Sequence, residues 1–196
     1  VAENTPICLG SIYLLDGVQP PSGENGDLII GNDSGSGMTV HEDGRISLIT
    51  EGKEPIDIDH QSASVYLGED YSVPNNGYTK VPFDTVKSDA EELFRPTTHD
   101  FQTAVYGLYN ISASIEIPSA GQNNAYTLAV FINGNEEKRV TRQSAVNAPL
   151  SVQVTTFEYL DTGDVIDIRI ENISSSNKTI TGSDLTTDFN IRREGI

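Results

Sequence analysis

The sequence predicts an all-β protein in which a C-terminal antiparallel jelly-roll sandwich follows a small N-terminal module rich in β-hairpins. Three observations predict this. Apolar and polar residues alternate with period two over most of the 196 residues, and Gly, Asn, Asp and Pro separate the alternating runs. Helical spacing is confined to Ser88–Phe94, where Ser88 and Glu91 resemble a capping box around one helical turn.

Residues 1–60 contain short apolar runs separated by Gly-, Pro-, Asn- and Asp-rich segments. "SIYLLDG" and "GDLIIG" are two such runs, and "GMTVHEDGRISLIT" is a hairpin candidate that turns at Asp43-Gly44. A segment with so few apolar residues can build only a small core of its own. We therefore expect residues 1–60 to form an anchoring arm or collar, and residues 61–196 to form the jelly-roll head.

The clearest strand is "YNISASIEI", from Tyr109 to Ile117. Its odd-numbered residues are apolar and its even-numbered residues are polar, which predicts an antiparallel strand with one buried face and one wet face. Pro118 ends the strand, because proline cannot donate a ladder hydrogen bond.

The next strand, "YTLAVFIN", is apolar on both faces. Tyr126 and Leu128 lie on one face, and Ala129 and Phe131 lie on the other. Such a strand lies deep, either between two layers or against another subunit. A module of this size has little interior to hide both faces, so we expect a threefold subunit interface that includes Tyr126, Leu128 and Phe131.

Three further strands complete the predicted sandwich. "LSVQVTTFEYL" alternates through Val152 and Val154 and then slips phase to Phe157 and Tyr159, which predicts a bulge or bend. After the turn "DTGD", "VIDIRIE" alternates isoleucines with charged residues. The final strand is "LTTDFNI", with Leu185 on its apolar face.

The charge balance limits the partners that this protein can have. There are 29 acidic and 12 basic residues, for a net charge of −17, and Lys and Arg do not cluster. Such a surface repels phosphate backbones and anionic membranes, so we expect neither nucleic-acid binding nor membrane insertion. The single cysteine, Cys8, cannot form an internal disulfide, and no apolar run is long enough for a transmembrane helix. No signal peptide is predicted, because no basic region with an apolar stretch opens the sequence.

The sequence shows no catalytic motif. The three histidines, His41, His60 and His99, are far apart and lie in turn-like settings. Asp57 and Asp59 share one side of a strand as a glycosidase pair might, but the chain has no Trp to line a sugar cleft. We therefore predict a protein that is not an enzyme and has no catalytic residues.

A calcium site is the one metal site worth considering. "DTGDVID" places Asp161, Asp164 and Asp167 within seven residues, and loop carboxylates suit a hard cation. The spacing does not match an EF-hand, and a polar turn that starts a strand explains it several times better. We predict no cofactor, with these three residues as calcium candidates.

Several segments together resemble, in order, the strand motifs of the complement C1q globular head, which belongs to the tumour-necrosis-factor-like (TNF-like) superfamily. The segments run from Ser62 to Ile191: "SASVYL", "KVPFDTV", "FRPTTHDFQTAVYGLYNISASI", "LAVFINGN", "YLDTGDVIDIRIEN" and "LTTDFNI". The positions that match the family's motifs are Val81, Pro82, Phe83, Phe94, Gly107, Tyr109, Asn133, Gly134, Gly163 and Asp164.

The sequence departs from this family in two places. The family has Gly before its Phe and Phe-x-Ala-Pro after it, whereas this chain reads "THDFQTAVYG", and its last strand lacks the closing Ser-Gly. The resemblance therefore implies a fold, a jelly roll that packs as a compact homotrimer, and carries over no ligand site.

The N-terminal region suggests the setting. "GSGMTVHEDGRISLIT" is similar to collar and shaft segments of bacteriophage fibres, and an Asn/Ser/Thr/Gly-rich chain with one Cys suits a virion protein. We expect a homotrimeric phage structural protein on the particle surface, as a short head fibre, spike or decoration protein. Residues 1–60 would dock on capsid or tail proteins, and the head would bind a host-surface glycan or protein receptor or reinforce the capsid. The alternatives are a secreted bacterial C1q-like lectin or adhesin, and a polysaccharide depolymerase.

Overall fold

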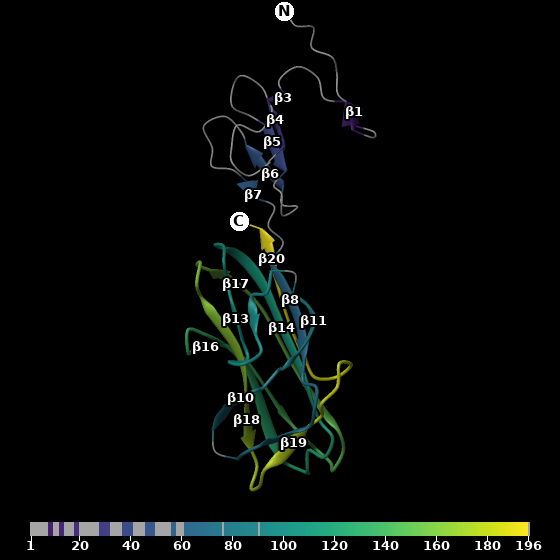
Figure 1. Ribbon diagram of the computed structural model, residues 1–196. Helices are drawn as coiled ribbons and strands as arrows, with labels where there is room; N and C mark the ends of the chain where they lie inside the picture. Colours follow the sequence, from purple (N-terminus) through teal and green to yellow (C-terminus); the bar gives the residue numbers. More distant parts are fainter. Residues whose placement is uncertain are drawn as a thin grey trace, which may run out of the picture. The chain divides into compact units, whose positions relative to one another are not determined.

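The computed structural model describes residues 61–195, apart from positions 76 and 90, and before residue 61 it describes only the backbone of short strands (Figure 1). The chain divides into two compact units, Val1–Asp59 and His60–Ile196.

The strands of the first unit are short and antiparallel. One hairpin pairs β1 with β2, and a five-stranded sheet follows the chain order β3-β4-β5-β6-β7. The strand bounds are β1 Cys8–Leu9, β2 Ile12–Tyr13, β3 Val18–Gln19, β4 Leu28–Gly31, β5 Gly37–Val40, β6 Ile46–Ile49 and β7 Ile56–Asp57. The hairpin predicted over "GMTVHEDGRISLIT" is confirmed, because Val40 of β5 pairs with Ile46 of β6.

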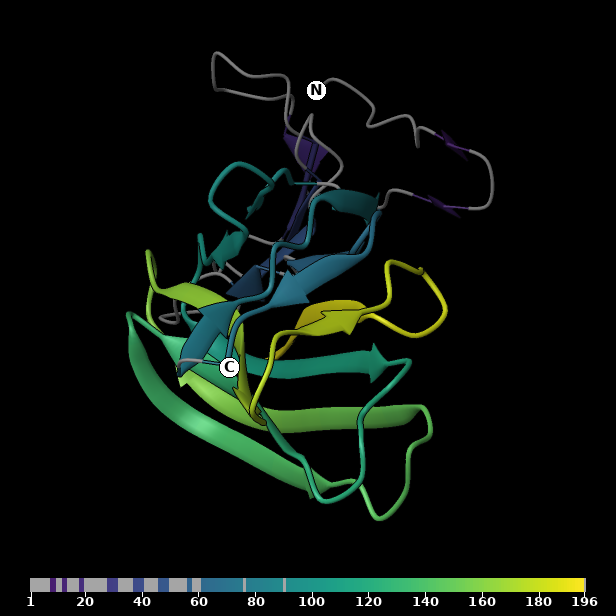
Figure 2. The same cartoon turned by 90° about the horizontal axis from the view of Figure 1, so that it is seen from below.

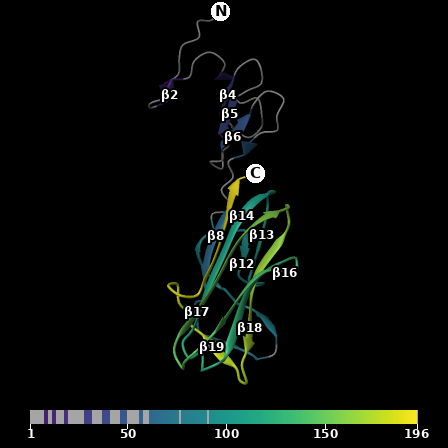
Figure 3. The ribbon, with the colours of Figure 1, turned by 180° about the vertical axis from the view of Figure 1, so that it is seen from behind.

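The second unit is a sandwich of two antiparallel sheets (Figures 1 and 3). Sheet 1 has the order β11-β8-β20-β14-β17, with bounds β8 Ser62–Tyr66, β11 Thr85–Ser88, β14 Gly107–Ile117, β17 Leu150–Leu160 and β20 Asp188–Gly195. Sheet 2 has the order β12-β13-β18-β15-β16, and β10 also pairs with β18. Its bounds are β10 Tyr78–Lys80, β12 Phe94–Arg95, β13 Asp100–Gln102, β15 Ala125–Ile132, β16 Asn135–Gln143 and β18 Val165–Ile173. The short strands β9 Tyr71–Val73 and β19 Lys178–Ile180 pair with each other.

The core lies between the two sheets and is built from the apolar face of each alternating strand. β14 shows the alternation most clearly, because its odd-numbered residues are buried and its even-numbered residues are half-buried, as its sequence pattern predicts. Aromatic rings cross the interior, and Phe189 of β20 contacts both Phe83 and Phe94. The largest fully buried side chains are Phe83, Phe101, Tyr109, Ile111, Ile115, Ile117, Tyr126, Leu128, Leu160, Ile166, Ile168 and Phe189.

Two turns that carry the family resemblance meet at one end of the sandwich. The side-chain amide of Asn133 donates to Asp164 Oδ1 at 2.8 Å, and Asn133 Oδ1 accepts the backbone N–H of Val165 at 3.0 Å. Gly134 and Gly163 have φ values of 80° and 92°, which a residue with a Cβ adopts only with strain. The hydrogen bonds of Asn133 therefore join the β15–β16 turn to the β17–β18 turn.

Strand β15 is buried on both faces within a single protomer. Tyr126 and Leu128 point into the core, while Phe131 lies on the opposite face. The edge of the Tyr78 ring packs on Phe131 with centroids 5.1 Å apart, and the guanidinium carbon of Arg169 lies 4.1 Å from the Phe131 centroid. Neighbouring strands of the same chain therefore cover the second apolar face, which removes the reason for assigning it to a neighbouring subunit.

The phase slip in "LSVQVTTFEYL" does not mark the bulge or bend that the sequence predicts. β17 pairs with β14 in one continuous register, from Gly107 opposite Leu160 to Ile117 opposite Leu150. The slip arises because Phe157 and Tyr159 occupy outward-facing positions on a regular strand. The two aromatics thus lie on the surface of sheet 1.

Two smaller expectations are also corrected. The final strand begins at Asp188, and Leu185 lies before it in a turn with 85% of its surface exposed. The segment from Ser88 to Phe94 forms no helix in the described residues. Instead, the carboxylate of Asp89 accepts hydrogen bonds from the backbone N–H groups of Leu93 and Phe94, which closes a turn leading into β12.

Candidate assembly surface

One face of sheet 1 points away from the core, and we call it the open face. The pairing of β14 with β17 and β20 determines its composition. At its centre lie small hydroxyl-bearing side chains, among them Ser112 and Ser114 of β14 and Thr155 of β17, all at least partly exposed. Because these side chains are short, another chain can approach the backbone of β14 and β17 closely.

One end of the open face carries an aromatic cluster, defined here as Tyr106, Phe157 and Tyr159. Their exposed fractions are 46%, 56% and 63%. The rings of Tyr106 and Tyr159 stack with centroids 6.2 Å apart and an angle of 19° between their planes. Exposed aromatic groups of this size are typical of interaction surfaces, because burying them removes apolar surface from contact with water, which is favourable.

The cluster follows from local sequence. Tyr106 immediately precedes Gly107, which pairs with Leu160 at the end of β17. That register brings Tyr106 beside Tyr159, although the two residues are far apart in the chain. Strand β17 is also an edge strand, paired only with β14, so the cluster lies where sheet 1 ends. An edge with exposed aromatics can bury them by contacting a second copy of the chain.

The residues predicted for the subunit interface do not lie on the open face, because β15 belongs to sheet 2. Tyr126 and Leu128 are fully buried in the core of one protomer, which leaves them no surface to offer a neighbour. Burial also raises the pKa of Tyr126. Phe131 retains 6% exposure beneath Tyr78 and Arg169. Periodicity alone could not separate this covered apolar face from the exposed aromatics of β17.

The three calcium candidates are engaged in different interactions. Asp164 Oδ2 accepts the backbone N–H of Asp161 at 2.8 Å, so these two residues form a closed turn. Asp167 points instead into an ion network, where its carboxylate is 2.6 Å from Arg169 Nε and 3.3 Å from Lys80 Nζ. Within the described part of the chain, no three His, Cys, Asp or Glu side chains are grouped so that they could hold a metal ion.

The ion network on the outer surface of sheet 2 was not predicted from the sequence. Lys80 Nζ lies 3.2 Å from Asp100 and 3.3 Å from Asp167, and Arg95 lies 2.7 Å from Asp100. Burial acts to raise the pKa of Asp100, but hydrogen bonds from Thr98, Arg95 and Lys80 outweigh it and lower the pKa below its ordinary value. The network joins β10, β12, β13 and β18 and therefore stabilises the sheet.

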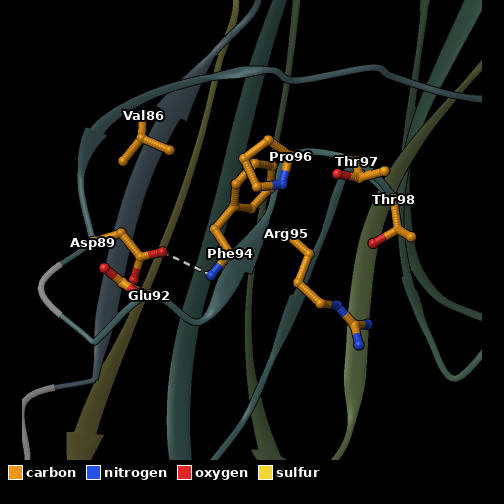
Figure 4. Close-up of a pocket in the computed structure, with 8 residues that line it drawn as sticks. All are labelled: Val86, Asp89, Glu92, Phe94, Arg95, Pro96, Thr97 and Thr98. Carbon is orange, nitrogen blue, oxygen red and sulfur yellow. Dashed lines mark hydrogen bonds between the residues drawn. The ribbon is translucent and has the colours of Figure 1, made fainter.

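A cavity of about 670 Å³ lies between β11 and the turn that leads into β12 (Figure 4). Two of its polar side chains already have partners in the fold. Asp89 accepts two backbone N–H groups of its own turn, and Arg95 binds Asp100 and Gln102. The residues that line it are Val86, Asp89, Glu92, Phe94, Arg95, Pro96, Thr97 and Thr98.

Of the histidines and the carboxylate pair considered for catalysis, only His99 lies fully within the described residues. His99 has a φ of 56°, and its Nδ1 lies 2.8 Å from the carbonyl oxygen of Phe83. His41, His60 and Asp59, and the side chain of Asp57, lie outside the described residues. No helix in the described part is long and apolar enough to cross a membrane.

Comparisons with solved structures identify the fold of the second unit. The globular domain of zebrafish complement 1qA superposes with a TM-score of 0.55 at 17% identity, covering 69% of this chain and 98% of that one. Murine APRIL at pH 5.0 gives 0.54 at 14% identity, covering 69% and 99%. Eiger TNF from S. frugiperda gives 0.53 at 10% identity, covering 68% and 92%. No protein-family model and no curated protein matches the sequence.

These similarities confirm the predicted fold, an all-β jelly roll of the TNF and C1q type. At such low identity they show the fold alone.

Proposed function

We propose that this protein is a non-enzymatic, homotrimeric structural protein of a bacteriophage particle. Its jelly-roll head projects from the particle surface and binds the host surface or reinforces the capsid. Residues 1–60 dock on other virion proteins of the capsid or tail, and no cofactor is required.

The aromatic cluster on the open face is the observation that supports a trimer. Tyr106, Phe157 and Tyr159 are each about half exposed or more in one protomer, on a chain of net charge −17. An acidic protein of this kind gains solubility from its charge, so three adjacent exposed rings need a separate explanation. Burial of the three rings between copies of the chain supplies one, and it matches the homotrimer implied by the family resemblance.

The geometry of the open face supports a closed assembly. Small side chains at its centre, such as Ser112 and Ser114, allow close approach, while the rings stand at the edge formed by β17. In a cyclic trimer, an edge of one protomer meets the face of the next, so a cluster at the border between edge and face contributes to every contact. The acidic exterior then keeps assembled trimers apart.

The viral setting rests on the first unit and on composition. The β4-β5-β6 hairpins are short, and the unit has too few apolar residues for a large core of its own. Docking against partner proteins would compensate for this. A secreted bacterial lectin or adhesin is the second candidate, because its head would have the same fold and an equally exposed surface.

Native mass spectrometry of the full chain at neutral pH tests the assembly. The expected species has about three times the 21.2 kDa mass of one chain. A stable monomer at micromolar concentration would refute the trimer. Co-sedimentation of the protein with purified phage particles, and its loss when residues 1–60 are deleted, would test the virion setting.

A further inference from the structure

The two ends of the sandwich are distinguished by their turns. The turn end holds Asn133 and Asp164, and the far end is where β14 finishes at Ile117 and β16 finishes at Gln143. Strand β16 runs between these ends as the edge strand of sheet 2, and it lies beside β17, as the view from below in Figure 2 shows. The β16 edge and the aromatic cluster of β17 therefore belong to the same side of the sandwich.

Charge is unevenly distributed along β16. Two glutamates lie near its start at the turn end, and three basic residues follow toward the far end. All five are exposed, and they are Glu136, Glu137, Lys138, Arg139 and Arg142. The strand from Lys138 onward is therefore basic, on a chain whose net charge is −17.

Two of these cations project from the same side of the strand. Lys138 and Arg142 flank Val140, which packs against the core, so alternation places all three on the side of β16 that faces sheet 1. Arg139 points the other way and lies 3.3 Å from Glu136. Neither Lys138 nor Arg142 forms an ion pair within the described part of the chain.

Strand β17, which lies beside β16, does not pair with these cations. Its one carboxylate is that of Glu158, whose Oε1 accepts the hydroxyl of Thr156 at 2.6 Å. A cation at an exposed edge is stabilised more strongly when a carboxylate of a second molecule approaches it and water is excluded. An acidic partner surface would therefore suit Lys138 and Arg142.

The open face of sheet 1 carries such an acidic region near the far end. Asp188 of β20 lies there because it pairs with Ser114, and Glu116 of β14 is next to the end of its strand. Both carboxylates belong to half-buried residues, and neither forms an ion pair within the described residues. Asp188 accepts a hydrogen bond from the side-chain amide of Asn190, which leaves its charge unbalanced.

The cations of the open face are already engaged. Lys87 of β11 lies 3.3 Å from Asp184, and Arg192 of β20 lies 3.8 Å from Glu194. The open face therefore has unpaired negative charge toward the far end, and β16 has unpaired positive charge toward the same end.

A ring of protomers would bring these two charged regions together. When the rotation axis runs along the strands, a residue keeps its height in every copy, so residues that meet lie at similar distances from the far end. Counted in residues from that end, Asp188 lies between Arg142 and Lys138. The charges on β16 also oppose the addition of another strand to this edge, so the edge is suited to meeting a face.

We propose that Lys138 and Arg142 of one protomer form ion pairs with Asp188 on the open face of the next protomer. This deepens the proposed trimer and rests on it, because it names the edge that meets the open face and the charges that orient the contact. The contact is heterologous, so it recurs at every interface of a closed ring. The aromatic cluster supplies apolar area beside it, and the ion pairs determine which edge and which height are matched.

The experiment measures, by sedimentation at neutral pH, the protein concentration at which half of the full-length chain is trimeric. We expect this concentration to rise at least about tenfold in Lys138→Glu/Arg142→Glu and in Asp188→Arg, because like charges then meet at every interface. The variant that combines all of these substitutions reverses both sides of the contact. Its half-assembly concentration should return to within about threefold of wild type.

Arg139→Glu is the matched control, since it reverses a charge on the same strand but on the other side. It should leave assembly within about threefold of wild type. Asp188→Asn removes the charge and keeps the shape of the side chain, so it tests the same contact if circular dichroism shows that Asp188→Arg does not fold. Its assembly should respond less than that of wild type when NaCl is raised from about 0.05 to about 0.5 M.

Some outcomes would overturn the ion pairs and leave the trimer in place. These are unchanged assembly of the edge and face variants, an equal loss in Arg139→Glu, no recovery in the combined variant, or the same response to NaCl in Asp188→Asn as in wild type. A wild-type chain that stays monomeric at all concentrations would refute the trimer and the ion pairs together.

Discussion

Tyr106 and Tyr159 stack in a nearly parallel arrangement on the surface of sheet 1, with ring centroids 6.2 Å apart and an angle of 19° between their planes. Tyr106 ends the loop before β14, and Tyr159 lies near the end of β17, so the contact joins segments more than fifty positions apart. With Phe157 beside it, the stack forms a rigid apolar platform where sheet 1 ends. A platform of this kind is stabilised further when a second protomer covers it.

The double substitution Phe157→Ser and Tyr159→Ser tests this platform. We expect the proposed trimer to dissociate to folded monomers, because loss of two aromatic anchors costs about 2 kcal/mol or more each at a buried interface. Sedimentation velocity would detect the change in mass, and far-ultraviolet circular dichroism would show that the fold persists. Leu185→Ser is the matched control, since Leu185 is exposed but lies outside the aromatic cluster. A double variant that remains trimeric would remove the open face from the interface.

Phe131 is expected to contribute to stability rather than to assembly. Phe131→Ala should lower the free energy of unfolding by about 3 kcal/mol, because it removes a buried ring together with its contacts to Tyr78 and Arg169. Urea unfolding would measure the loss. Ile173→Ala is the control, since Ile173 is half exposed and should cost less than about 1 kcal/mol. Dissociation of Phe131→Ala into folded monomers, without a loss of stability, would restore Phe131 to the interface.

The ion network makes stability depend on pH. The pKa of Asp100 is lowered in the folded protein, so its contribution is fully present above the unfolded value of 3.8 and is lost as pH falls below it. Asp100→Asn should therefore destabilise the protein by about 2 kcal/mol at pH 7, and the difference from wild type should shrink as pH falls below about 4. Thermal unfolding at several pH values would measure both. A difference that stays constant down to pH 3 would contradict the lowered pKa.

The hydroxyl of Tyr109, near the start of β14, makes hydrogen-bond contacts with residues that come earlier in the chain. It donates to the carbonyl of Val105 at 2.7 Å and lies 2.5 Å from Gln61 Oε1, which also accepts the N–H of Ala104. Tyr109→Phe should cost about 1–2 kcal/mol, because buried acceptors lose a donor. Tyr159→Phe removes an exposed hydroxyl and keeps the ring stack, so its unfolding free energy should match wild type. Equal stability of the two variants would show that the buried hydroxyl contributes nothing.

Calcium should leave the head unchanged. Asp164 accepts the backbone N–H of Asp161, and Asp167 pairs with Lys80 and Arg169, so both carboxylates are already engaged by groups of the protein. A bound ion stabilises the folded state by mass action, so the Tm should be the same in millimolar CaCl2 and in EDTA. An increase in Tm with CaCl2 that Asp161→Asn abolishes would establish a calcium site.

Local sequence was sufficient to predict several strands, of which β14 is the clearest. The alternation from Tyr109 to Ile117 identified β14 and its buried face, because period two places every second side chain on the same side of a strand. The turns at Gly134 and Gly163 were recognisable because both have positive φ values that favour glycine. The order of these motifs was enough to indicate the jelly roll.

Only the tertiary structure decided which apolar groups remain exposed. The pattern of β15 looked like an interface, but Tyr78 and Arg169 cover Phe131, and the slip at Phe157 looked like a bulge although β17 is regular. Periodicity tells which side of its own strand a side chain occupies, whereas exposure depends on neighbours brought close by long-range pairing.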